Sequence, residues 1–170
     1  MLGALEITTK RLRLRPLLAE DTARIVEMLN MLEISRWLAQ IPHPFTEADC
    51  RIVDESGLPL WPRNMGIEQT GALIGTVSTI PHFGYYLDPA YWGRGFMAEA
   101  AQAALDHVFV WQERDEISSG YFEGNEASGR ILEGLGFRHT GSSTITSRAT
   151  GTAHHHADMV ITRKDWEARR

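Results

Sequence analysis

Residues 87–100 combine residue types that can bind an anion. A predicted strand ends at Asp88, and a glycine-punctuated loop leads directly into a predicted long helix. The first backbone N–H groups of a helix have no intrahelical acceptor, and the helix dipole places partial positive charge there. Gly93 and Gly95 let the backbone approach a phosphate without a Cβ in the way, and Arg94 adds a cation at the rim. The segment therefore predicts a phosphate-binding site.

The same glycines have other interpretations. They also fit a plain helix entry, in which they only allow tight packing. A Walker loop requires a lysine after its last glycine, and none follows here. A Rossmann loop requires a third glycine early in a parallel βαβ unit, whereas this loop lies past mid-chain. The pattern alone leaves the anion site and the plain helix entry open.

Composition and charge are typical of an ordinary soluble globular protein. The 170 residues are 43% apolar and 23% charged, with a net charge of −5. This acidic balance argues against a nucleic-acid partner, and no apolar run is long enough to span a membrane. We expect one domain over residues 1–170 and, because no secretory signal is visible, a cytoplasmic location. Cys50 is the sole cysteine, and the histidines at 154–156 lack an acid or cysteine to complete a ligand set, so we expect no metal.

Periodicity predicts the elements that position the loop. Strands are predicted over residues 9–16, 65–69, 72–80, 82–87, 117–122, 137–145 and 156–162. Helices are predicted over residues 20–32, 46–57, 95–111 and 125–135. Thr70 and Gly71 are expected to form a hairpin turn, and Thr46 with Asp49 resembles a capping box. This order predicts an α/β domain, in which helices pack on a mixed sheet.

Several segments, in the expected order, resemble one family. Residues 91–100, with the sequence YWGRGFMAEA, resemble the acetyl-CoA pyrophosphate loop of the GNAT superfamily of N-acetyltransferases. The closer resemblance is to the RimJ/RimL-like branch, which acetylates the N-termini of ribosomal proteins. The first strand, the fourth strand, the N-x-x-S element and the L-G-F element of that branch are similar to residues 9–16, 84–89, 125–128 and 135–137. The resemblance spans about residues 9–166.

The resemblance implies the GNAT fold, a mixed and mostly antiparallel central sheet of about six to seven strands with helices on both faces. Its fourth and fifth strands, here 82–87 and 117–122, splay apart. The pantetheine arm of acetyl-CoA is then expected in the wedge, bonded to backbone near Tyr86 and Leu87 and touching Asn125. The pyrophosphate is expected on the backbone N–H groups of Gly93, Arg94, Gly95, Phe96, Met97 and Ala98. Ala90 is a departure, because the wider superfamily often has Gln or Arg there.

The family is understood to transfer acetyl by direct attack of an amine in a ternary complex. By resemblance, Ser128 at the N-x-x-S position donates a hydrogen bond to the departing thiolate, unless it is an ordinary first-turn residue. Many members carry Glu two residues before the fourth-strand glycine, where this chain has His82. An imidazole can accept the proton of an incoming ammonium, although His82 is also explained as a solvent-facing strand end. Glu68 on the neighbouring predicted strand and water are the other candidates for the base.

The acceptor pocket is expected between the first two helices and their connection. Trp37, Phe45 and Tyr85 are its candidate walls, or else core residues. The resemblance implies a primary amine as acceptor, either a protein N-terminal α-amine or a small-molecule amine, and a monomer or homodimer. The alternative function is a non-catalytic acyl-CoA-binding sensor or partner module, which the missing Glu leaves open.

Overall fold

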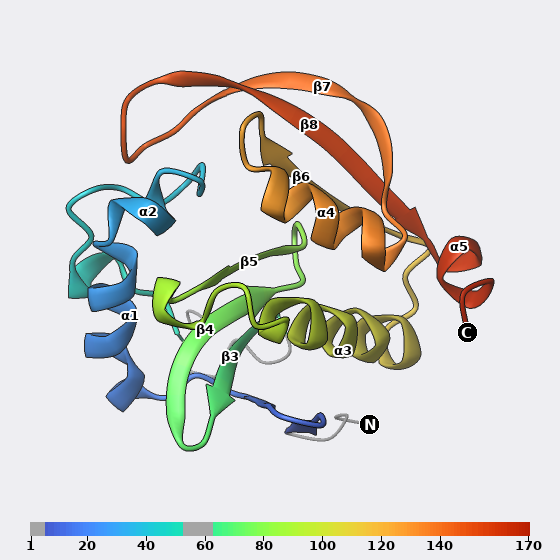
Figure 1. The fold of residues 1–170 in the computed structure, drawn as a ribbon, viewed down its shortest axis with the longest axis horizontal. Helices are drawn as coiled ribbons and strands as arrows, with labels where there is room; N and C mark the ends of the chain where they lie inside the picture. The colour runs from blue at the N-terminus through green and yellow to red at the C-terminus, as the bar shows by residue number, and fades with distance from the viewer. Residues whose placement is uncertain (1–5, 53–62) are drawn as a thin grey trace.

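The computed structural model describes residues 6–52 and 63–170, which form two antiparallel sheets (Figure 1). The five-stranded sheet has the order β1-β2-β3-β4-β5, with strands Ile7–Thr8, Arg13–Arg15, Asn64–Gln69, Ala72–Ser78 and Gly84–Leu87. The three-stranded sheet has the order β6-β8-β7, with β6 at Glu116–Phe122, β7 at Arg138–Thr146 and β8 at Ala153–Thr162. Together with the helices they form the α/β architecture that was predicted.

Helices cover both faces of the larger sheet. The α-helices are α1 (Thr22–Leu29), α2 (Leu32–Ser35), α3 (Phe96–Trp111), α4 (Glu126–Leu135) and α5 (Arg163–Glu167). Leu73 and Ile74 are neighbours on β4, so their side chains point to opposite faces. Leu73 belongs to the core cluster under α1, whereas Ile74 belongs to the main core under α3. The predicted helices over 95–111 and 125–135 are confirmed as α3 and α4. No helix among the described residues is both long and apolar enough to cross a membrane.

Two of the predicted elements are shorter than expected. The strand predicted over 9–16 is interrupted by a turn, in which the Thr9 N–H donates to the Leu12 carbonyl at 2.9 Å, so only Arg13–Arg15 pairs as β2. The capping box of Thr46 and Asp49 is present, but it opens a single 3-10 turn at Glu47–Asp49. Cys50 then adopts an extended conformation and packs on the core cluster under α1, which ends the turn. The rest of the predicted helix, from residue 53, lies outside the described residues.

The predicted hairpin turn is confirmed. Gln69 pairs with Ala72, and the two residues between them, Thr70 and Gly71, both have positive φ, 48° and 85°. This left-handed pair matches the twist of the flanking strands, which is why two-residue hairpins favour it.

The two strands on either side of the expected wedge, β5 and β6, diverge from a common base. The Phe83 N–H donates to the Ser118 carbonyl at 2.8 Å, and Ser119 Oγ donates to the Phe83 carbonyl at 2.7 Å. Beyond this point β5 pairs with β4 and β6 pairs with β8, each in its own sheet. The predicted splay is therefore present, and the expected central sheet is divided in two at the splay.

The β7–β8 hairpin closes the structure above the splayed strands. Figure 1 shows it arching from α5 across the molecule toward α2. At its tip, Arg148 donates its N–H to the Ala39 carbonyl at 3.0 Å and Nη1 to the Gln40 carbonyl at 3.2 Å. The hairpin and the segment after α2 thus bridge the wedge.

Candidate functional site

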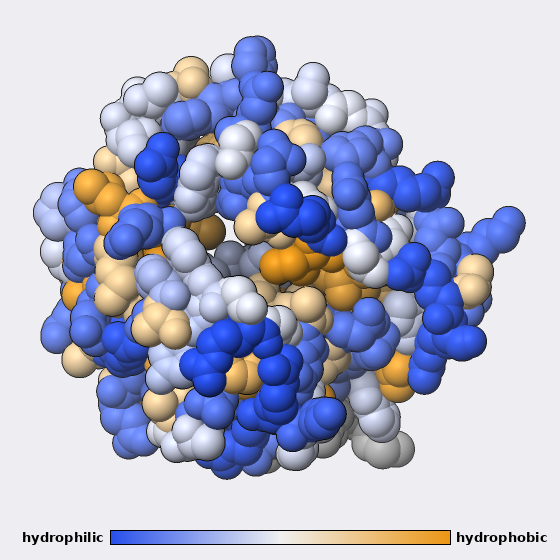
Figure 2. Space-filling view, viewed as in Figure 1, coloured by the Kyte–Doolittle hydropathy of each residue, from blue (hydrophilic) through white to orange (hydrophobic). Residues whose placement is uncertain are grey.

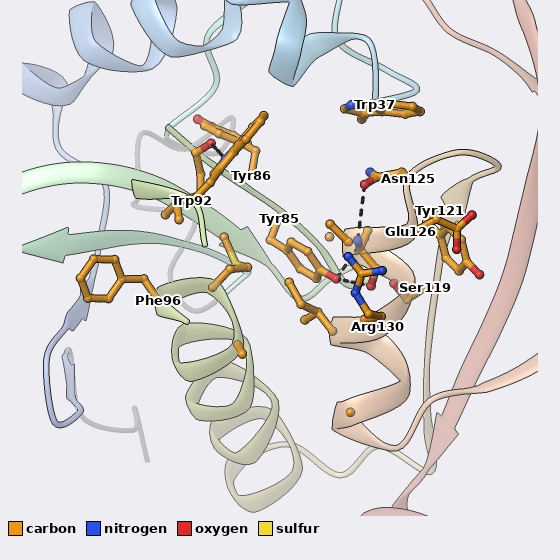
Figure 3. A pocket seen from close by; sticks show the side chains of 18 of the residues that line it. Trp37, Tyr85, Tyr86, Trp92, Phe96, Ser119, Tyr121, Asn125, Glu126 and Arg130 are labelled. Carbon is orange, nitrogen blue, oxygen red and sulfur yellow. Dashed lines mark hydrogen bonds between the residues drawn. The ribbon is translucent and has the colours of Figure 1, made fainter. Parts of the chain in front are cut away.

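A cavity of about 800 Å³ lies in the wedge between β5 and β6 (Figure 3). Figure 2 shows the surface hollowed at this place, near the centre of the face. The lining comes from α2 and its following turn, from β5, from the glycine loop with the start of α3, and from β6 with α4. Predicted site residues in the lining are Trp37, Tyr85, Tyr86, Leu87, Gly93, Gly95, Phe96, Met97, Ala98, Asn125 and Ser128.

The open edge of β5 presents backbone groups to this cavity. The Asp88 N–H donates to the Ile74 carbonyl of β4 at 2.8 Å. In an antiparallel pair the backbone N–H and C=O groups of successive residues point alternately toward and away from the partner strand. Tyr86 therefore turns its backbone groups to β4, whereas Tyr85 and Leu87 turn theirs to the wedge. Trp92 Nε1 donates to the Leu87 carbonyl at 2.7 Å. The groups left for a ligand are the N–H and carbonyl of Tyr85 and the N–H of Leu87, which differs from the expectation for the Tyr86 backbone.

The glycine loop forms a cradle of backbone N–H groups. Gly93 and Gly95 have φ values of 69° and 74°, in the left-handed region that favours glycine. The first hydrogen bond of α3 runs from the Glu99 N–H to the Gly95 carbonyl at 3.2 Å, so the N–H groups of residues 96–98 precede the helical ladder. A Cβ at Gly93 would meet no described atom within 4 Å. Gly93 therefore faces open space, and the free N–H groups of the loop are donors that fit a phosphate.

A buried carboxylate holds the start of the loop. Asp88 is 6% exposed, and its Oδ1 accepts the Ala90 N–H at 2.8 Å. Its Oδ2 pairs with the Arg24 guanidinium of α1, which also donates to the Leu73 carbonyl at 3.3 Å. The loop is thus anchored to the helix on the opposite face of the sheet.

Arg94 lies outside the cavity lining. Its guanidinium is 4.8 Å from the centroid of the Phe96 ring and 5.7 Å from that of Tyr91. The side chain therefore stacks on these two rings and does not contribute to the cavity lining.

Two hydroxyl groups meet across the wedge. Tyr85 Oη lies 3.1 Å from both Ser128 Oγ and the Ser128 carbonyl oxygen. Asn125 caps α4, with its Oδ1 accepting the Ser128 N–H at 3.4 Å. Burial raises the pKa of Tyr85 to about 12, so its phenol is protonated and can donate a hydrogen bond. Tyr85, expected only as a wall, thus shares a hydrogen bond with the predicted thiolate-binding serine.

The two candidate bases lie outside the cavity lining. His82 is exposed at the base of the splay, with Nδ1 2.7 Å from Ser118 Oγ. Glu68 lies on β3, separated from β5 by β4, where it accepts hydrogen bonds from Arg13 Nε at 3.0 Å and Arg15 Nε at 2.7 Å. The hydrogen bond from Arg13, with that from Arg15, lowers the pKa of Glu68, which weakens it as a base.

Of the predicted acceptor walls, Trp37 and Tyr85 reach the cavity and Phe45 does not. Phe45 is 6% exposed and belongs to the core cluster under α1. Its N–H and carbonyl bond to the side-chain amide of Asn30, at 2.8 and 2.7 Å. The Trp37 ring instead lies against Gly124, at 3.6 Å from the position of a Cβ on that residue.

Five lining residues that are labelled in Figure 3 were not predicted as site residues. They are Trp92, Ser119, Tyr121, Glu126 and Arg130. Glu126 and Arg130 are four residues apart and share one face of α4, but the sequence contains no signal that this face lines the cavity. Tyr121 had no signal, because its place depends on how β6 splays. No group of three His, Cys, Asp or Glu able to hold a metal occurs in the described part of the chain.

Comparison with known proteins gives consistent matches. Residues 11–138 match the family described as Acetyltransferase (GNAT) domain. The chain is 32% identical over 104 residues to YjcK of Bacillus subtilis (strain 168), named as an N-acetyltransferase; the match covers 56% of this chain and only 58% of that relative. It is 22% identical over 176 residues to YdaF of the same strain, named as a ribosomal N-acetyltransferase, with 93% and 94% covered.

A solved structure shows the same fold. Spermidine N-acetyltransferase from Vibrio cholerae, in complex with CoA and spermine, aligns with a TM-score of 0.77 at 20% identity. The alignment covers 94% of this chain and 99% of that one.

Proposed function

The chain belongs to the GNAT acetyltransferase family, and from this premise we propose that it transfers acetyl from acetyl-CoA to a primary amine by direct attack in a ternary complex. The observation that carries the proposal is the wedge cavity. It brings the open N–H cradle, the free backbone edge of β5 and the Tyr85–Ser128 hydroxyl pair into one space of about 800 Å³.

The donor would be held largely by main-chain groups. The N–H groups of Gly93, Gly95 and residues 96–98 would bind the diphosphate, supported by the positive end of the α3 dipole. The Tyr85 backbone and the Leu87 N–H would pair with the amides of the pantetheine arm, as an added strand would. Asn125 keeps its capping role and also faces the arm.

In the proposed reaction, the amine nitrogen attacks the thioester carbonyl carbon and the C–S bond breaks. Ser128 and Tyr85 would donate hydrogen bonds to the sulfur as its negative charge develops. A thiol has a pKa of about 8.5, well below the value of about 12 for Tyr85. Full proton transfer from Tyr85 to the thiolate is therefore unfavourable. The attacking nitrogen gives its proton to a base, and the departing thiolate takes up a proton from water, so that the products are the amide and the free thiol of CoA.

We assign the base role to His82, acting through water. His82 lies at the base of the splay. Glu68, on β3, is instead paired with two arginines of β2. His82→Ala is expected to lower kcat/KM about tenfold near pH 7, with little effect near pH 9, because at alkaline pH the amine enters unprotonated and hydroxide or water can accept the proton that it releases. The measurement is the pH–rate profile, with His155→Ala, an exposed histidine on β8, as control. An unaltered profile would remove His82 from the mechanism.

The acceptor is proposed to be a protein N-terminal α-amine or a small-molecule amine. YdaF, named as a ribosomal enzyme, and the spermidine enzyme support these two classes. Glu33 and Glu126 in the lining, against Arg130, favour a cationic amine. Thiol release from acetyl-CoA, measured against a panel of amines and N-terminal peptides, tests the proposal.

A second candidate function is an acyl-CoA-binding sensor. The observation in its favour is His82, at the position where many relatives of the family carry Glu. A sensor binds CoA in calorimetry and releases no thiol with any amine of the panel, whereas the proposed enzyme does both.

A further inference from the structure

Arg11, which lies outside the cavity lining, hydrogen-bonds to the glycine loop. Arg11 Nη1 donates to the Arg94 carbonyl at 2.8 Å, and Arg11 Nε donates to Glu99 Oε2 at 2.7 Å. The guanidinium also lies 4.6 Å from the centroid of the Phe96 ring. One side chain from the segment before β2 thus contacts the loop on both sides of Gly95.

These contacts determine where an N–H group points. In a trans peptide the carbonyl and the following N–H point in opposite directions. Because Arg11 holds the Arg94 carbonyl, the Gly95 N–H is turned away from Arg11, toward the side on which Gly93 and Gly95 line the cavity. Glycine has several accessible backbone conformations, so without this hydrogen bond the peptide would be free to rotate.

Glu99 is an unexpected neighbour for an anion site. It lies in the first turn of α3, where its negative charge would repel a diphosphate. Its Oε1 accepts hydrogen bonds from Thr9 Oγ1 at 2.6 Å and from the Arg11 N–H at 2.8 Å, while Oε2 accepts Arg11 Nε. All its partners belong to the segment that carries Arg11, so the carboxylate orients that arginine.

We propose that Arg11 is a positioning residue for the acetyl donor: oriented by Glu99 and Thr9, it holds the Arg94–Gly95 peptide in the conformation that receives the diphosphate. This rests on the proposed function, which places the diphosphate in the cradle. The contribution is preorganisation of the loop, so the entropy of ordering it is not lost when the donor binds.

The first test compares two ligands. Arg11→Met is expected to raise the Kd of CoA about tenfold, since it removes one charge-assisted hydrogen bond that orders the loop. Binding of pantetheine, which lacks the diphosphate, is expected to be unchanged in NMR titration. Arg13→Met is the matched control. Arg11 and Arg13 are 40% and 43% exposed and both pair with glutamate, but Arg13 contacts Glu6 and Glu68 and not the loop. Its CoA Kd is expected to equal that of the wild type.

The second test separates positioning from direct binding of phosphate by the Arg11 charge. Glu99→Gln keeps an acceptor at Oε1 but presents an NH₂ group to Arg11 Nε. If Arg11 positions the loop, this variant binds CoA several-fold more weakly, because the loss of loop order outweighs the loss of repulsion between Glu99 and the diphosphate. If Arg11 is instead a phosphate ligand, removing a nearby negative charge tightens CoA binding, and the proposal is overturned. Arg11→Lys retains the charge without both hydrogen bonds, so it is expected to resemble Arg11→Met.

The outcomes distinguish the two proposals. Absence of CoA binding by the wild type would refute the proposed function and this inference with it. Normal CoA binding by the wild type and an unchanged Kd in Arg11→Met would refute the inference alone. Thermal unfolding of each variant shows whether it is folded. If Arg11→Met does not fold, the sign and size of the change in CoA Kd in Glu99→Gln and Arg11→Lys test the inference instead.

Discussion

Gly95→Asp is expected to weaken CoA binding by more than about 100-fold. Gly95 has a φ of 74°, which costs a residue with a Cβ about 1–2 kcal/mol. The added carboxylate would point to the Arg11 side of the loop, and like charges about 8 Å apart at an effective dielectric constant of about 20 still repel by about 2 kcal/mol. The Cβ would also lie 3.3 Å from Arg11 Nη2, so the carboxylate would compete for the arginine that holds the loop. Since about 1.4 kcal/mol corresponds to a tenfold change in Kd, the sum of these costs raises the Kd of CoA by more than about 100-fold.

Two controls separate strain from charge. Gly95→Ala introduces the strain alone and is expected to weaken CoA binding about tenfold. Gly71→Asp introduces the same strain and charge in the β3–β4 turn, where φ is 85° and no described atom lies within 4 Å of the Cβ position. It is expected to bind CoA normally in calorimetry. An unchanged CoA Kd in Gly95→Asp would show that the diphosphate does not bind in this cradle.

Ser128→Ala is expected to lower kcat about 100-fold while the Kd of CoA changes little. Ser128 Oγ faces the cavity beside Tyr85 Oη, where the donor sulfur would leave. Removing one donor that stabilises a developing negative charge commonly costs about 10²–10³ in kcat. The measurement is single-turnover thiol release at saturating acetyl-CoA. Ser142→Ala, an exposed serine on β7, serves as control.

Tyr85 supplies an internal check on that prediction. Its pKa of about 12 means that the phenol stays protonated from about pH 6 to pH 10, so its titration causes no loss of rate over that range. Tyr85→Phe is expected to lower kcat less than Ser128→Ala, and the double variant to lose less than the product of the two effects, because the hydroxyls share a hydrogen bond. Fully independent effects would indicate that the pair does not act as a unit.

The cradle of free N–H groups was predictable from the sequence because its geometry is local. A strand end, two glycines and the start of a long amphipathic helix determine where free N–H groups occur, whatever packs around them. The Thr70–Gly71 turn was predictable for the same reason, since its hydrogen bonds and backbone angles involve only adjacent residues.

The tertiary structure alone decided which side chains share the site. Tyr85 and Ser128 are 43 residues apart, and Arg11 and Glu99 are 88 apart. Glu68 pairs with arginines on another strand, and Phe45 is buried in the core under α1, so neither side chain lines the cavity. Such contacts arise when strands pair and helices pack, and they leave no periodic pattern in the neighbouring sequence. The sequence therefore determined the main-chain cradle proposed for the donor, while packing over long separations decided which side chains lie beside it.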